Sequence, residues 1–178
     1  MPQLVLPTVA VHRSYLAAWD ELEPGEERWM GAHGVSEDWT REEVEDPVEF
    51  ARLVAAIRRG SDPATELPAD MVHHTVLWFV EGTEWLGRLS IRHSLTAALL
   101  EIGGHIGYVV RPSVRRRGYA TDMLIQSLPF AARLGIDPAL VTCDTDNEPS
   151  RKVIEAAGGE LEDERHGKLR FWVPTRVS

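Results

Sequence analysis

The chain has 178 residues, of which 43% are hydrophobic, and its formal net charge at pH 7 is −9. This length supports one ordinary domain with a core of its own, and no apolar run reaches the roughly 18 residues that a membrane-spanning helix needs. A single cysteine, Cys143, excludes an internal disulfide, and the first residues lack the features of a signal peptide. We therefore expect a cytoplasmic protein with no membrane partner.

The negative charge is concentrated in one segment. Residues 20–46 contain eleven acidic residues and two arginines, so this segment alone accounts for the net charge. Nucleic-acid binders usually carry a broad basic face, because their affinity comes from many contacts with phosphates. Three consecutive arginines at 115–117 beside an acidic segment do not make such a face. We therefore expect no nucleic-acid partner.

The first third of the chain predicts one short strand and two helices. Residues 3–6 are apolar and are typical of an edge strand, and Thr8 offers an N-cap to a helix that follows. A second helix is predicted over residues 46–60, where Asp46 is the N-cap and Glu49 completes a capping-box pattern. The acidic segment between them contains glycines and a proline, which indicates a loop with at most a short helix.

The rest of the chain alternates between strand and helix patterns. The pattern predicts a hairpin over residues 73–95, a loop over 96–103, a strand over 104–110, a helix over 118–135, a strand over 139–145, a helix over 148–159 and a closing hairpin over 159–174. This order indicates one α/β domain, with a mixed sheet and helices on both of its faces.

The turn between the strand at 104–110 and the next helix carries the strongest chemical signal. The first turn of a helix exposes unpaired backbone N–H groups with partial positive charge, which suit a phosphate. Gly118 permits a close approach to the backbone, Ala120 keeps the next contact small, and arginines 115–117 supply positive charge. The turn can therefore hold a pyrophosphate mainly through its main chain. A Walker-type loop is excluded, because no Gly-Lys-Ser/Thr follows a glycine at the required spacing.

The run Arg115-Arg116-Arg117-Gly118-Tyr119-Ala120 resembles the Arg/Gln-x-x-Gly-x-Gly/Ala signature of the GNAT N-acetyltransferase superfamily. The preceding strand and Asn147-Glu148-Pro149-Ser150 are also similar to that superfamily, and the resemblance covers residues 72–173. It implies that residues 1–178 form a single GNAT-like domain, with a mostly antiparallel sheet of about six to seven strands.

The resemblance also implies acetyl-CoA as the acyl donor, and no metal. Main-chain groups of the strand would pair with the pantetheine arm, the arginine turn would bind the pyrophosphate, and the next helix would lie beside the sulfur. The residues expected to bind the cofactor are Tyr108, Val109, Val110, Arg115, Arg116, Arg117, Gly118, Tyr119, Ala120, Thr121, Asn147 and Ser150.

The catalytic residues are less clear from the sequence. Many relatives carry a glutamate as general base where this chain has His105, whose imidazole has an ordinary pKa of about 6.5 and can accept a proton near neutral pH. Glu101 is the second candidate base. A hydrogen-bonded histidine of the sheet and an exposed loop carboxylate are the respective structural alternatives. Relatives often place a tyrosine acid where this chain has Ile154, which leaves Ser150 as a proton relay or no dedicated acid.

The function expected from this resemblance is an acetyl-CoA-dependent N-acetyltransferase that acts on a primary amine of a small molecule or peptide. The acidic segment, with Trp29 and Trp39, suits a cationic amine; the alternative is a solvated acidic loop anchored by the two tryptophans. Because Ile154 replaces the usual tyrosine, a catalytically silent acetyl-CoA sensor or regulatory module is the alternative function. Homodimers are frequent in the superfamily, and the closing hairpin could serve as an interface, although nothing in the sequence requires a dimer.

Overall fold

A computed structural model describes residues 1–35 and 38–176. Its seven strands form one sheet in the order β1-β2-β3-β4-β5-β7-β6, and every neighbouring pair is antiparallel except β4 and β5. The strands are β1 (Gln3–Val5), β2 (His74–Glu81), β3 (Glu84–Arg92), β4 (Ile106–Val110), β5 (Ala139–Asp144), β6 (Glu160–Arg165) and β7 (Lys168–Val173). The expected mixed, mostly antiparallel sheet of six to seven strands is confirmed.

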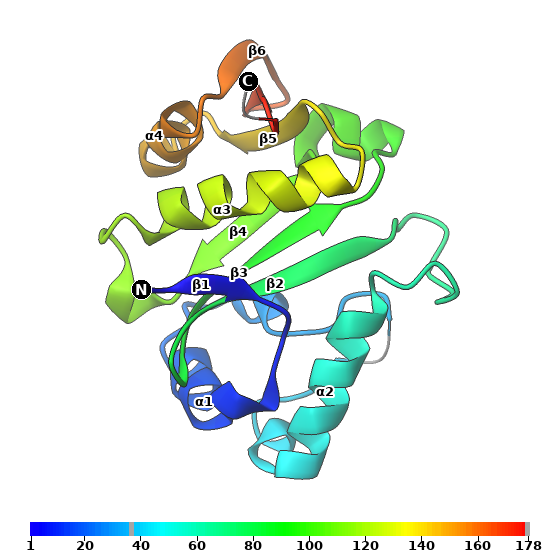
Figure 1. Cartoon of the computed structure of the whole chain (residues 1–178), viewed down its shortest axis with the longest axis vertical. Helices are drawn as coiled ribbons and strands as arrows, with labels where there is room; N and C mark the ends of the chain where they lie inside the picture. Colours follow the sequence, from blue (N-terminus) through cyan, green and yellow to red (C-terminus); the bar gives the residue numbers. More distant parts are fainter. Residues whose placement is uncertain (36–37, 177–178) are drawn as a thin grey trace.

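Helices cover both faces of this sheet (Figure 1). The α-helices are α1 (His12–Asp20), α2 (Pro47–Arg59), α3 (Tyr119–Arg133) and α4 (Glu148–Ala156). Short helical turns lie at η1 (Val9–Val11), η2 (Glu27–Trp29), η3 (Glu43–Glu45), η4 (Leu99–Gly103) and η5 (Pro112–Val114). The acidic segment contains two short helical turns, η2 and η3, where one at most was expected, and its other described residues between α1 and α2 form loops.

Two hydrophobic cores lie on opposite faces of the sheet. One contains α3 and α4 side chains such as Met123 and Ile154, together with Phe79 and Phe171 of the strands. The other packs α1 and α2 against β2 and β3, around an aromatic cluster of Tyr15, Phe50, Trp78 and Trp85. Since these cores share one sheet, strand β4 in its centre can be reached by elements from both faces.

Three local features differ from the expectations based on the sequence. Thr8 caps η1, and α1 begins only at His12. Asp46 caps α2 as expected. The Glu49 carboxylate, however, contacts Trp39 and Arg52, so only the Asp46 half of the predicted capping box forms. The predicted loop over residues 96–103 contains the π-helical turn η4, whose carbonyls at Leu100 and Ile102 accept hydrogen bonds from β7 and β5 side chains.

Strands β4 and β5 diverge almost as soon as they meet. Their only register pair within the described residues is Ile106↔Val141. Just before it, His105 N donates to Leu140 O at 2.7 Å, and Leu140 N donates to His105 Nδ1 at 2.9 Å. Beyond it, the edge of β4 that faces β5 has no strand partner in the register. A backbone edge left open inside a fold must find other hydrogen-bond partners, which makes it a natural binding surface.

Close packing between β3 and β4 generates a stability prediction. A methyl group at Gly87 would lie 2.6 Å from Val109 O and 3.1 Å from Met123 Sδ, whereas one at Gly107 would meet Trp29 at an ordinary 3.6 Å. We therefore expect Gly87→Ala to lower the free energy of unfolding by about 1–3 kcal/mol through overpacking. Gly107→Ala is the matched control on the neighbouring strand. Urea denaturation of both variants checks this, and equal stabilities would contradict it.

Candidate active site

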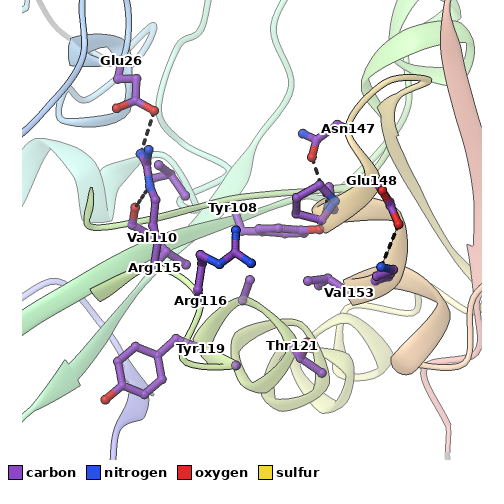
Figure 2. Close-up of a pocket in the computed structure, with 16 residues that line it drawn as sticks. Glu26, Tyr108, Val110, Arg115, Arg116, Tyr119, Thr121, Asn147, Glu148 and Val153 are labelled. Carbon is purple, nitrogen blue, oxygen red and sulfur yellow. Dashed lines mark hydrogen bonds and ion pairs between the residues drawn. The ribbon is translucent and has the colours of Figure 1, made fainter. Parts of the chain in front are cut away.

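A cavity of about 830 Å³ lies where β4 meets the N-terminal ends of α3 and α4 (Figure 2). Its walls come from β4, from the turn before α3, from the start of α4 and from one residue of the acidic segment. The lining residues are Glu26, Tyr108, Val109, Val110, Arg115, Arg116, Gly118, Tyr119, Ala120, Thr121, Asn147, Glu148, Pro149, Ser150, Lys152 and Val153. This cavity therefore brings together eleven of the twelve residues expected to bind the cofactor; Arg117 does not line it.

The turn before α3 presents backbone N–H groups to the cavity. Gly118 is the N-cap of α3 with φ +83°, and no side chain caps the helix. Arg116 also adopts a left-handed conformation, with φ +65°. The first-turn N–H groups of a helix have no intrahelical partner, and the helix dipole adds partial positive charge there. The start of α3 therefore has the backbone geometry of the anion site that the sequence predicts.

The three consecutive arginines have different surroundings. Arg115 Nη2 pairs with Glu26 at 2.7 Å, and its Nε donates to Val110 O at 3.0 Å, so its charge is largely compensated. Arg116 extends between Tyr108 and Tyr119 in Figure 2, at the centre of the cavity wall. Of the three side chains, Arg116 is thus the one placed to meet an anion in the cavity.

The start of α4 holds a hydroxyl pair that the sequence did not reveal. Asn147 Oδ1 accepts from Ser150 N at 3.1 Å and so caps the helix. Tyr108 Oη and Ser150 Oγ are 2.7 Å apart. Burial raises the pKa of Tyr108 to about 12, although its bond to Ser150 opposes this. Tyr108 is therefore a neutral phenol that can donate a proton at the α4 end of the cavity.

Tyr108 was expected to act through its main chain only. The signal that could have found its side chain is the alternation along β4, since residues 106, 108 and 110 share a face. Ile106 and Val110 belong to the core under α3 and α4, so Tyr108 points toward the same helices. Which helix residue meets its hydroxyl depends on how α4 docks, and the strand pattern does not contain that information.

His105 lies at the vertex between β4 and β5, outside the lining of this cavity. Its Nδ1 accepts the Leu140 N–H, so the proton of the neutral ring is on Nε2. Burial and the positive charge of Arg92 lower the pKa of the ring. The lone pair that a base needs is thus engaged with the backbone.

Glu101 lies in η4, also away from the cavity lining. Its Oε1 pairs with Arg165 of β6 at 2.8 Å, and its Oε2 lies 3.6 Å from His166. These contacts tie η4 to the closing hairpin. The structure therefore brings Ser150 to the cofactor residues, and places both candidate bases elsewhere.

A second cavity of about 380 Å³ lies next to η2, where β2 and β3 face the acidic segment. Trp29 lines it and also lies against Gly107 of β4, so the two cavities adjoin the same strand. Among residues 1–35 and 38–176, no group of three or more histidine, cysteine or acidic side chains could hold a metal ion. No helix in that part of the chain is long and apolar enough to cross a bilayer.

Comparisons with known proteins give one family and a consistent set of structures. A family model described as an acetyltransferase (GNAT) domain matches residues 21–160. A search of curated proteins finds no match. Among solved structures, the microcin C7 self-immunity acetyltransferase MccE in complex with acetyl-CoA and AMP has a TM-score of 0.59 at 13% identity, over 96% of this chain and 91% of that one.

Two ribosomal-protein acetyltransferases are similar to the same extent. The ribosomal-protein-S5-alanine acetyltransferase from Vibrio fischeri has a TM-score of 0.58 at 14% identity, over 98% of this chain and 92% of that one. The ribosomal L7/L12 alpha-N-protein acetyltransferase RimL in complex with coenzyme A has a TM-score of 0.54 at 16% identity, over 96% of this chain and 90% of that one. At these identities the likeness concerns the fold.

The family match spans most of the chain, including strand β4, the arginine turn and the start of α4. The sequence signature, the parting strands and the cavity between α3 and α4 agree with it. The chain belongs to the GNAT acetyltransferase family.

Proposed function

We propose that this protein is an acetyl-CoA-dependent N-acetyltransferase that acts on a primary amine of a small molecule or peptide. The observation that carries the proposal is the cavity itself. It joins an anion-binding helix start at one end to a hydroxyl pair at the other, along the open edge of β4. Similar folds have been solved with acetyl-CoA and with coenzyme A, which supports the choice of donor.

Successive parts of the cavity suit the pyrophosphate, the pantetheine arm and the thioester of this donor. The backbone N–H groups at the start of α3 and the Arg116 guanidinium are suited to the pyrophosphate. The β5-facing edge of β4 has no strand partner beyond Ile106, and its main-chain groups at Tyr108 suit the amide-containing pantetheine arm, while Val110 O is already bonded to Arg115 Nε. The Tyr108–Ser150 pair then lies at the end where we place the thioester.

The proposed chemistry is direct attack of the amine on the thioester. The amine nitrogen forms a bond to the acetyl carbon, the C–S bond breaks, and the thiolate leaves with the electron pair. Tyr108 donates its phenolic proton to that thiolate and is reprotonated through Ser150, while the amine proton passes to water. A phenol with a pKa of about 12 is protonated at neutral pH but is a weaker acid than the thiol that forms, so the transfer requires that a proton return to Tyr108 through Ser150 in the same step.

His105 and Glu101 stay predictions as the general base. For His105 to act, its ring would have to give up the bond from Leu140 N that fixes the vertex of the sheet. The single-domain organisation of residues 1–178, homodimerisation and a cytoplasmic location likewise stay predictions. The silent-sensor alternative was motivated by Ile154, and Tyr108 weakens it, because a phenol from β4 reaches the helix that lacks one.

Neighbouring arginines provide a matched test of the donor site. We expect Arg116→Gln to raise the Kd for acetyl-CoA about five- to tenfold, because a charge-assisted contact with the pyrophosphate is lost. Arg117→Gln, which removes the same charge outside the cavity lining, should change the Kd less than twofold. Isothermal titration of both variants measures this. An equal rise in Kd in both variants would mean that only the overall positive charge of the turn contributes to binding.

The acid role of Tyr108 makes a kinetic prediction. We expect Tyr108→Phe to lower kcat by about 10²-fold with little change in acetyl-CoA affinity, as is usual when a general acid is removed. Because the pKa is near 12, wild-type kcat should show no alkaline limb from this group between pH 7 and 10. Tyr119→Phe, at another wall of the cavity, is the control. A Tyr108→Phe enzyme with unchanged kcat would rule the role out.

A further inference from the structure

The second cavity carries positive charge, although it is bordered by the most acidic segment of the chain. Its volume of about 380 Å³ suits a small molecule. The lining comes from η2 and the loop after it, from Met71 and from β2 and β3. The residues are Arg28, Trp29, His33, Met71, His74, Arg88, Ser90 and Arg92, with no carboxylate among them.

Arg88 is the most unusual of these residues, because only 2% of it is exposed. Its Nη1 donates to Trp29 O at 2.7 Å and to Gly31 O at 2.6 Å, while its buried Nε has no hydrogen-bond partner. Burial lowers the pKa of Arg88 to about 10, which still leaves it charged at neutral pH. A buried guanidinium held only by carbonyls is costly unless an anion balances its charge.

The other two arginines are also without a carboxylate partner among the described residues. Arg92 Nη1 donates to Gly103 O at 3.2 Å and Gly104 O at 3.1 Å. The Arg28 guanidinium lies 5.6 Å from the centre of the Trp29 ring. Carbonyl oxygens and an aromatic face orient these cations but do not neutralise them. Among the described residues that line it, the cavity therefore combines three positive charges with no carboxylate.

Two histidines complete the wall, and both favour the neutral form. Burial, with the charge of Arg88, lowers the pKa of His33, and burial lowers that of His74. Asp38 is the carboxylate that acts on His33, and it lies beside Gly31, outside the cavity lining. The histidines can therefore add hydrogen bonds to a ligand, while the arginines supply the charge.

The cavity adjoins the strand at which the reaction is proposed. Ser90 pairs in register with Gly107, and the Trp29 ring covers Gly107 at 3.6 Å from where a Cβ would lie. Gly107 immediately precedes Tyr108, the proposed acid. A molecule in this cavity thus lies near β4, next to residues that line the donor cavity.

Resting on the proposed function, we propose that this cavity binds the anionic group, a carboxylate or a phosphate, of a small acceptor amine. From the acidic segment, the sequence had predicted a cationic acceptor instead. In the structure, however, carboxylates of that segment are engaged elsewhere: Asp20 and Glu45 with Arg41, and Glu26 with Arg115. The sign of a binding site depends on which side chains line it, and here arginines do.

Matched pairs of amines test this sign directly. We compare kcat/KM for γ-aminobutyrate with that for butylamine and 1,4-diaminobutane, and for O-phosphoethanolamine with that for ethanolamine. In at least one set, the anionic member should be at least tenfold better than its neutral counterpart. The two sets separate a carboxylate ligand from a phosphate ligand. Equal rates in both sets, or a preference for the dication, would overturn the proposal.

Arg28→Gln and Arg133→Gln form the matched variants. Both arginines are exposed and lie over an aromatic ring, but Arg133 is on α3, outside the cavity lining. We expect Arg28→Gln to reduce the preference for the anionic amine at least threefold, and Arg133→Gln to leave it unchanged. Arg92→Gln is a second variant. If neither Arg28→Gln nor Arg92→Gln alters the preference, the cavity is not the anion site.

Binding without turnover separates this proposal from the proposed function. If no amine is acetylated, thermal shifts are measured with acetyl-CoA and, separately, with γ-aminobutyrate and O-phosphoethanolamine. A shift with an anionic amine that is lost in Arg28→Gln supports the cavity even though the enzymatic proposal has failed. If no such shift occurs while acetyl-CoA still stabilises the protein, the proposed anion site is wrong and the proposed donor site stands.

Discussion

Strands β4 and β5 lie side by side in the sheet, but they stay paired only around Ile106 and Val141. On the closed side of this pair, His105 N donates to Leu140 O and the His105 Nδ1 accepts the Leu140 N–H, and the strands part on the other side of the pair. Past that point, β4 has no strand partner on the β5 side, and Val110 O accepts a hydrogen bond from the Arg115 side chain instead. Everything at the site follows from this opening, because a closed sheet would leave β4 with no free edge for a ligand.

Two cavities with different surroundings adjoin β4. On the side of α3 and α4, backbone N–H groups and Arg116 border the larger cavity, while Glu26 compensates Arg115. Near η2, Arg88 and its neighbours border the smaller cavity. Both environments are positive in a chain of net charge −9. Few of the acidic residues line either cavity, because many of those carboxylates pair with residues of loops and helix ends.

The acidic segment therefore has a structural role that its composition did not indicate. Arg41 ties Asp20 at the end of α1 to Glu45 of η3, and Arg111 ties Glu21 to the end of β4. These pairs are partly exposed, so each contributes modestly to stability. The η2 region is held to the sheet by Arg88, whose Nη1 donates to the carbonyls of Trp29 and Gly31.

The amino-acid sequence alone determined the order of the strands and helices, the mixed sheet and the glycine turn at Gly118 that begins α3. These depend on local periodicity, capping and backbone freedom, which neighbouring residues encode. Only the tertiary structure decided that Tyr108 meets Ser150, that His105 is bound to Leu140, and that Arg88 lies in a cavity with Arg28 and Arg92. Those contacts join residues far apart in the chain. Their distances and charges depend on how helices and loops dock on the sheet, which no local pattern specifies.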